Sequence, residues 1–223
     1  MRYIAAEFPQ VNLDEKIIDL YAVATLFFST GGTFWETNKS WKSSSSVCTW
    51  YGIECDDVGH IVSINLHRNK LVGKIPPELA LLAPRTIGED LWTTGLIRLD
   101  LSHNAIGGGI PMQIDQLVFM KECLLNDNQL TGVVPLGMGE WVSPQHISLE
   151  SNNLFGEVPS VLCQNDTTLV ISVDCQEVVC QCCKPHCSIS STPSPETAGT
   201  SESESEGTKD SNHGNDNGFE RKR

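Results

Sequence analysis

The sequence predicts an α/β fold in which short coils stack into a repeat solenoid with a cap at each end. One phrase of apolar residues occurs four times, and its asparagine repeats every 24 residues from Asn104 to Asn128 and again to Asn152. Eight of the nine cysteines lie on either side of the repeats. A coil of this size cannot bury its apolar edge alone, so recurrence at a fixed period requires neighbouring copies to stack.

The repeats occupy residues 61–162, and Leu96–Pro111 (LIRLDLSHNAIGGGIP) contains the phrase in full. Apolar residues alternate through Leu99 and Leu101, which predicts a short strand with these side chains in the core and the intervening ones on the outer face. Asn104 follows at an inward position, where its amide can bond backbone groups of the turn and of neighbouring coils. Gly108 permits a backbone that side chains resist, and Pro111 ends strand pairing.

Residues 1–60 are expected to form an N-terminal cap. Apolar residues at three- and four-residue steps predict a helix over Asp14–Ser29. Its predicted buried face comprises Ile17, Leu20, Tyr21, Ala24, Phe27 and Phe28. A Cys48–Cys55 disulfide beside Trp50 and Ile53 would then cover the apolar end of the first coil.

The interval from Asn69 to Asn104 is 35 residues, which is 11 more than the other intervals. Removing residues 83–93 (APRTIGEDLWT) would restore the period, so we interpret this segment as an insertion between two coils. We expect a bulging loop with Leu91 and Trp92 tucked against the coil. An artefact of the gene model and a loop with its own function are the alternatives.

Residues 163–187 are expected to form a cysteine-rich C-terminal cap, and residues 188–223 an acidic Ser/Glu-rich tail that is disordered. The cap contains six cysteines: Cys163, Cys175, Cys180, Cys182, Cys183 and Cys187. Three disulfides are predicted, and the sequence does not choose among the fifteen possible pairings. Zinc bound by this cluster with His186 is the alternative, although the spacing differs from the usual paired C-x2-C. Cys123 stands at a core strand position and is predicted to be a buried free thiol.

The cysteine content favours an oxidising compartment, so we predict an extracellular or cell-surface protein. Two glycosylation motifs, at Asn38 and Asn165, agree with secretion. The sequence shows no signal peptide and no membrane span, so membrane association is expected only if an anchor is missing from this chain. The net charge of −13 argues against nucleic acid as a partner.

The sequence contains no pattern that predicts catalysis. The run at 107–109 falls on the glycine position of the repeat, without the motif of a phosphate-binding loop. There is no G-x-S-x-G and no H-E-x-x-H, and the paired carboxylates lie in expected turns. We therefore expect no enzyme activity, no catalytic residues, no metal and no small-molecule cofactor.

The outward positions of the strands and of the residues that follow them define a candidate ligand-binding face. These positions are polar with mixed charge, and they contain few of the aromatic residues that dominate many interfaces. The alternative is a merely solvated sheet surface. The candidate ligand-binding residues are Arg68, Arg98, Asp100 and His103, which form the first cluster to test, followed by Glu122, Asn126, His146 and Glu150.

The repeats resemble the plant-type leucine-rich repeat, LxxLxLxxNxLxGxIPxxLxxLxx. The segment Trp41–Cys55, with its CTWYGIEC, is similar to the cap that precedes such repeats in receptor-like proteins and receptor kinases, and the preceding helix resembles the entry in leucine-rich repeat proteins of plants and algae. The resemblance covers roughly residues 14–162. It implies a right-handed, curved solenoid with a short parallel sheet on its concave side. The chain departs from a full receptor in having four full repeats, the insertion and no kinase segment.

The function that this resemblance implies is recognition without catalysis. The expected protein is secreted or part of a cell-surface receptor-like protein, and it binds a protein, peptide or glycan through the concave face. One alternative is an inhibitor of cell-wall-degrading enzymes, since plant inhibitors of this kind share the repeat and its caps. Another is a structural scaffold of the extracellular matrix.

Overall fold

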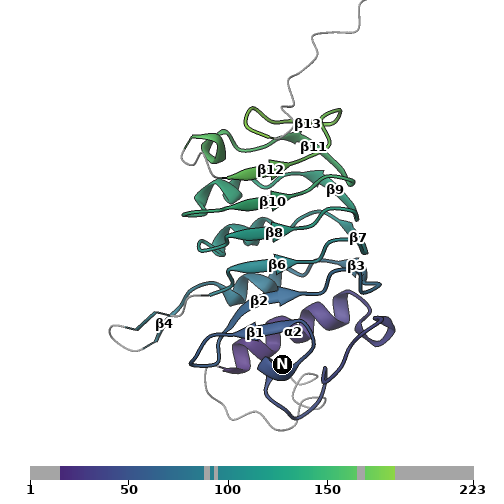
Figure 1. Cartoon of the computed structure of the whole chain (residues 1–223), viewed down its shortest axis with the longest axis vertical. Coiled ribbons are helices and arrows are strands. Elements are labelled where there is room, and N and C mark those ends of the chain that lie inside the picture. The colour runs from purple at the N-terminus through teal and green to yellow at the C-terminus, as the bar shows by residue number, and fades with distance from the viewer. Residues whose placement is uncertain (1–15, 88–90, 93–94, 165–168, 184–223) are drawn as a thin grey trace, which may run out of the picture. The chain divides into compact units, whose positions relative to one another are not determined.

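The computed structural model describes residues 16–87, 91–92, 95–164 and 169–183, with backbone alone at 86–87 and 91–92. In this part of the chain, successive coils stack and contribute strands to two sheets (Figure 1). The predicted fold class is confirmed: a right-handed α/β solenoid with a short parallel sheet on its concave side and disulfide-bonded caps. The predicted disordered tail lies outside the described residues.

The first sheet runs through all the coils. In spatial order its six strands are β1 (Ile53–Cys55), β2 (Ile61–Asn65), β6 (Arg98–Asp100), β8 (Glu122–Leu124), β10 (His146–Ser148) and β12 (Val170–Ser172). Strands β2 to β12 pair in parallel, and β1 is antiparallel to β2. Strands β2 to β12 are parallel because each coil contributes one of them at the same point of its turn, so every one runs in the same direction.

A second sheet and a column of short 3-10 helices complete the coils. The strands of this sheet are, in spatial order, β13 (Val178–Val179), β11 (Asn153–Glu157), β9 (Gln129–Val133), β7 (Ala105–Gly108) and β3 (Val72–Lys74). The helices are η3 (Pro77–Leu82), η4 (Met112–Gln116), η5 (Leu136–Glu140) and η6 (Ser160–Cys163). A repeat proline immediately precedes each of these helices, where it fixes the backbone for the turn.

The core lies between the sheets and the helices. The central residues of β6, β8, β10 and β12 are Leu99, Cys123, Ile147 and Ile171, and none is more than 1% exposed. Each stacks on its equivalent in the next coil, since the strands pair in register. The predicted inward position of the alternating residues is therefore confirmed.

The repeat asparagines bond neighbouring coils as predicted. The Asn104 side chain accepts hydrogen bonds from the backbone N–H groups of Asn69 and Leu71, and its amide nitrogen donates to the carbonyls of Leu66 and Leu101. Asn128 and Asn152 repeat this arrangement one and two coils later. These bonds satisfy backbone groups that the bend takes out of the sheet ladder.

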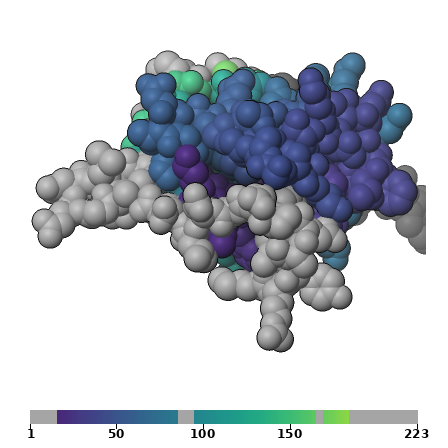
Figure 2. Space-filling view, turned by 90° about the horizontal axis from the view of Figure 1, so that it is seen from below, coloured from purple at the N-terminus to yellow at the C-terminus, as the bar shows by residue number. Residues whose placement is uncertain are grey.

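The N-terminal cap consists of α2 (Lys16–Ser29), η1 (Gly32–Phe34), η2 (Val47–Thr49) and β1. Its centre is an aromatic cluster in which Trp41 lies 4.8 Å from Trp35, 5.0 Å from Trp50 and 5.7 Å from Phe27 between ring centroids. The Cys48–Cys55 disulfide is formed beside this cluster. In Figure 2, which looks from below, the purple and blue residues of this cap and of the first coil make up most of the coloured surface.

The helix face predicted from apolar spacing is partly wrong. Leu20, Ala24 and Phe27 are buried, but Ile17 is 40% exposed and Phe28 is 49% exposed. Position 19 is buried instead, with a charged side chain, because α2 packs along both η3 and β3 and so buries a wider face than one apolar stripe. Among the described residues, no helix is long and apolar enough to cross a membrane.

The insertion at 83–93 contains a short hairpin. Strand β4 (Thr86–Ile87) pairs antiparallel with β5 (Leu91–Trp92), and in Figure 1 β4 projects outward from the stacked coils. The side chains of Leu91 and Trp92, which we expected to tuck against the coil, are outside the description. The two ends of the insertion are held together by a backbone hydrogen bond, in which Leu96 N–H donates to Leu82 O at 2.8 Å.

A buried ion pair joins the base of the hairpin to the cap. Asp19 of α2, which is 1% exposed, pairs with the guanidinium of Arg85, and its other oxygen lies 3.5 Å from His60 Nδ1. Asp19 also accepts a hydrogen bond from the backbone N–H of Ile61 at 3.3 Å. The helix, the first repeat strand and the start of the insertion therefore meet at one carboxylate.

Candidate ligand-binding face

The parallel register arranges the outward residues of the first sheet in columns. Ser63, Arg98, Glu122 and His146 form one column, and Asn65, Asp100, Leu124 and Ser148 form the next. Hydrogen bonds between coils continue past the strands, through Arg68 N to Ser102 O, His103 N to Asn126 O and Asp127 N to Glu150 O. The residues that follow the strands are therefore also aligned.

Two further columns lie at the end of the strands, next to the repeat asparagines. We call them the turn-side columns, and they comprise His67, Ser102, Asn126 and Glu150, and then Arg68, His103, Asp127 and Ser151. All members of the second group have left-handed backbone, with φ of 48°, 55°, 53° and 57°. This conformation is uncommon for residues other than glycine, so its recurrence shows that the bend after each strand is the same in every coil.

Arg98 links two coils at the centre of the face. Its guanidinium lies 3.1 Å from Glu122 Oε2 and 3.4 Å from Asp100 Oδ2. Asp100 is only 5% exposed, and its other oxygen accepts a hydrogen bond from Ser102 Oγ at 2.7 Å. The structure thus brings these predicted ligand-binding residues together, but Asp100 acts here as an internal anchor for Arg98.

His103 and its neighbours form a second polar group. His103 Nδ1 lies 3.2 Å from Asp127 Oδ2, and that same oxygen accepts a hydrogen bond from Asn126 Nδ2 at 2.7 Å. In the adjacent coil, His146 Nε2 and Ser148 Oγ are 3.0 Å apart. These contacts hold polar side chains in fixed positions on the surface.

The other two predicted residues lie at opposite ends of the turn-side columns. Arg68 is exposed, and no carboxylate among the described residues lies within ion-pair distance of it. Glu150 is half-buried, and its Oε2 is inaccessible to solvent without a hydrogen-bond partner in the described part of the chain. Neither side chain is joined to the Arg98 group.

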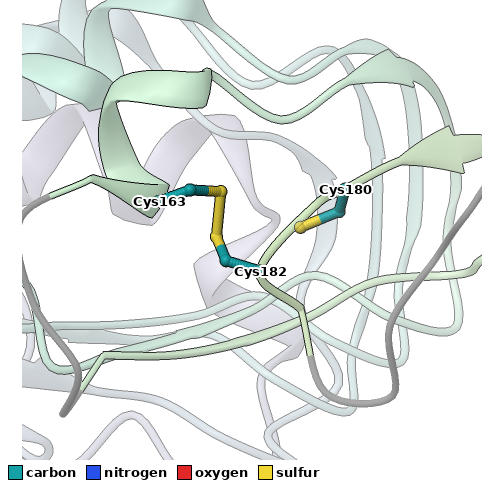
Figure 3. A group of neighbouring side chains, drawn as sticks. All are labelled: Cys163, Cys180 and Cys182. Carbon is teal, nitrogen blue, oxygen red and sulfur yellow. A yellow bond between two sulfur atoms is a disulfide. The ribbon is translucent and has the colours of Figure 1, made fainter.

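The C-terminal cysteines are joined in pairs. Cys163 bonds Cys182, and Cys180 bonds Cys183. The sulfur atoms of Cys163, Cys180 and Cys182 lie within 4.8 Å of one another, and Figure 3 shows the Cys180 sulfur turned toward the Cys163–Cys182 bond. Zinc requires thiolates, which these disulfides do not supply. Cys175 is also disulfide-bonded, whereas Cys187 and His186 lie outside the described residues.

Of the two predicted glycosylation sites, Asn38 is described and Asn165 is not. Asn38 is half-buried, and its Nδ2 donates to Gly32 O at 2.9 Å. A glycan on this nitrogen would leave one N–H in place, which is enough for that bond. Glycosylation at both positions stays a prediction.

Cys123 is a buried free thiol beneath the face. Burial, followed by the nearby charge of Asp100, raises the pKa of Cys123 to about 12 from its usual 9.0. The thiol therefore stays neutral at pH 8 in the folded protein. We expect iodoacetamide to leave Cys123 unmodified in the native protein at pH 8 and to modify it after unfolding in urea, as read by peptide mass spectrometry. Rapid labelling without urea would show that β8 opens locally.

Sequence reasoning missed one group of polar residues. Asp19, His60 and Arg85 come from three separate segments, and each was expected in another role or in none. Asp19, an acidic residue one turn inside an apolar helix, could have indicated a buried polar contact. Its partners could not be identified without the fold. Asp19 and His60 are only 1% and 6% exposed, so this group joins the cap to the first coil and offers little surface to a ligand.

Short segments of the chain are similar in sequence to known proteins. The sequence profile described as Leucine Rich Repeat matches residues 60–82 and 95–117. A probable leucine-rich repeat receptor-like protein kinase of Arabidopsis thaliana is 45% identical over 51 residues, which are 22% of this chain and 5% of that protein. The matched segment spans a tenth or less of the length of each curated relative that it matches.

Two solved ectodomains of Arabidopsis receptors share the fold. The ectodomain of the membrane receptor kinase GASSHO1/SCHENGEN3, in complex with Casparian strip integrity factor 2, is 28% identical with a TM-score of 0.52 and covers 65% of this chain and 16% of that one. The ectodomain of the receptor kinase HAESA, in complex with a peptide hormone ligand, is 20% identical with a TM-score of 0.53. The match covers 72% of this chain and 25% of the HAESA chain. At 20% identity, the similarity to HAESA shows a shared fold and nothing more.

Proposed function

We propose that this protein, whose leucine-rich repeats resemble those of plant receptor-like ectodomains, is a non-catalytic recognition module that binds a protein or peptide through the face of its first sheet. The carrying observation is the aligned, polar surface of the strands and turn-side columns. The Asn126–Asp127 hydrogen bond and the Arg98–Glu122 ion pair restrain its side chains before a ligand arrives, which lowers the entropy cost of binding. GASSHO1/SCHENGEN3 and HAESA, which share the fold, are receptors with bound ligands.

A protein or peptide suits this face better than a glycan. The four columns contain no phenylalanine, tyrosine or tryptophan on which a sugar ring could stack. They supply instead both charges and several amide and hydroxyl groups, which match the donors and acceptors of a polypeptide. The disulfides in both caps support an extracellular site of action, either as a secreted protein or as part of a cell-surface receptor-like protein.

The test is capture of ligands from a library of secreted proteins, peptides and glycans by the whole chain. The double variant Glu122→Ala/Asn126→Ala removes two side chains from the middle of the face. Thr131→Ala/Phe155→Ala, in strands of the second sheet, is the matched control because both of its side chains are exposed. We expect a polypeptide ligand whose affinity falls about tenfold in the face variant and is unchanged in the control.

Two results would count against the proposal. Equal binding by both double variants would place recognition elsewhere on the molecule. Slowed hydrolysis in a panel of cell-wall-degrading enzymes mixed with the protein would favour the inhibitor alternative. A scaffold would show neither a ligand specific to the face nor inhibition.

A further inference from the structure

The charges of the turn-side columns indicate which kind of peptide the face binds. On the basis of that function, we infer that the face binds an extended peptide segment with an acidic side chain at one end and a basic side chain four to six residues away. The acidic group pairs with Arg68 near β2, and the basic group pairs with Glu150 and Asp174 near β12.

The end of the columns near β2 is cationic. Arg68 is exposed, and its left-handed backbone, bonded through its N–H to Ser102 O, fixes where the side chain leaves the surface. The guanidinium has five N–H donors and no carboxylate partner among residues 16–87, 95–164 and 169–183. Lys70 lies nearby in sequence but pairs with Glu36 at 3.2 Å, so Arg68 is the cation that a ligand would meet.

The opposite end is anionic. Glu150 closes one turn-side column, and Asp174 stands at the equivalent position of the next coil, where its oxygens accept from the backbone N–H groups of Ser151 and Asn152 at 2.9 and 3.0 Å. These bonds hold the carboxylate without neutralising it. In the described part of the chain, neither carboxylate has a lysine, arginine or histidine within ion-pair distance.

The charged groups between these ends and beside them already have partners. In the middle of the columns, Asp127 Oδ2 lies 3.2 Å from His103 Nδ1 and accepts a hydrogen bond from Asn126 Nδ2. On the neighbouring strands, Arg98 lies between Asp100 and Glu122 and bonds both. The change from a positively charged end to a negatively charged end is therefore confined to the turn-side columns.

The spacing of the coils sets the spacing of the ligand charges. Neighbouring strands lie about 4.8 Å apart, so three steps from Arg68 to Glu150 span about 14 Å and four steps to Asp174 about 19 Å. An extended chain covers about 3.3 Å per residue, which corresponds to four to six residues.

The experiment measures binding of synthetic peptides to the whole chain at low salt, where surface charges are least screened. The probes share a neutral spacer of five residues and carry an acid and a base, two acids, or two bases at their ends. We expect the acid–base peptide to bind about fivefold more tightly than either other peptide, since one exposed ion pair contributes up to about that factor.

Charge reversal gives the sharper result. Arg68→Glu should shift the preference to the two-base peptide. Glu150→Lys/Asp174→Asn, which removes both carboxylates of the opposite end, should shift it to the two-acid peptide. Lys74→Glu, an exposed change in β3 of the second sheet, is the matched control and should change neither. Each variant's circular dichroism should match that of the wild type.

Two outcomes would overturn this inference, and they differ from failure of the proposed function. Equal affinities for the three peptides, or preferences that charge reversal leaves unchanged, would refute the charge pattern. So would absence of binding by the acid–base peptide at concentrations up to about 1 mM. A ligand captured through the face would stand in each case, whereas loss of capture would remove the proposed function itself.

Discussion

Replacing Asn104 by alanine is expected to lower the free energy of unfolding by about 3 kcal/mol. The side chain accepts from the backbone N–H groups of Asn69 and Leu71 and donates to the carbonyls of Leu66 and Leu101, each at 2.9 to 3.0 Å. Alanine leaves the two N–H groups and the Leu66 carbonyl without these partners, in residues that are at most 2% exposed, at about 1 kcal/mol or more for each, whereas Leu101 O keeps its bond from Asn128 Nδ2. The change is measured by urea unfolding of the oxidised protein, extrapolated to water.

Asn126→Ala is the matched control for this prediction. Asn126 lies on the outer face and bonds Asp127, so its removal should change the free energy by about 0.5 kcal/mol or less. Asn104→Asp separates the two kinds of bond, because it keeps the acceptor oxygen and loses the donor. It should destabilise less than alanine but more than the control. Equal stability of the alanine variant and the wild type would show that water replaces the side chain.

The repeats were predictable because their constraints are local and recur. Every coil needs inward residues at alternate strand positions, an amide at the bend and a proline before the next helix, so Leu99, Asn104 and Pro111 identify their own roles. The register of the columns follows from the same period. The positions of the candidate residues on the face could therefore be deduced without the structure.

The charge pairing on the face was not predictable in the same way. The sequence places Arg98, Asp100 and Glu122 near one another, but it does not reveal that Asp100 is buried and holds Arg98. That arrangement depends on the rotamers of these side chains and on how closely each coil packs against the next. Similarly, the ion pair of Asp19 and Arg85 joins residues 66 positions apart, one of them in the insertion that the repeat pattern does not describe.

The caps also depend on contacts that sequence spacing does not determine. Apolar periodicity located the helix but placed Ile17 and Phe28 in the core, because it assumes one packing partner. In the structure α2 contacts both η3 and β3. The pairings Cys163–Cys182 and Cys180–Cys183 are likewise a property of the folded cap, since any of fifteen pairings fitted the sequence.

The second large effect is expected in the N-terminal cap, where Trp41→Ala should cost about 4 kcal/mol. The ring lies within 5.7 Å of Phe27, Trp35 and Trp50 between centroids, and its Nε1 donates to Tyr51 O at 3.0 Å. Alanine creates a cavity among three aromatic rings and leaves the Tyr51 carbonyl without its donor. Because this cluster covers the apolar end of the first coil, the loss should lower the midpoint of the whole urea transition.

Trp41→Phe distinguishes the contribution of packing from that of the hydrogen bond. Phenylalanine keeps an aromatic ring in the cluster and loses the N–H, so we expect a cost of about 1 to 2 kcal/mol. Phe34→Ala is the control, since that ring belongs to the same cap but is 84% exposed. If Trp41→Ala produces a separate early transition while the main midpoint is unchanged, the cap unfolds independently and the repeats are stable without it. A single transition at lower urea would show that the coils depend on the cap to cover their end, as stacking of incomplete units requires.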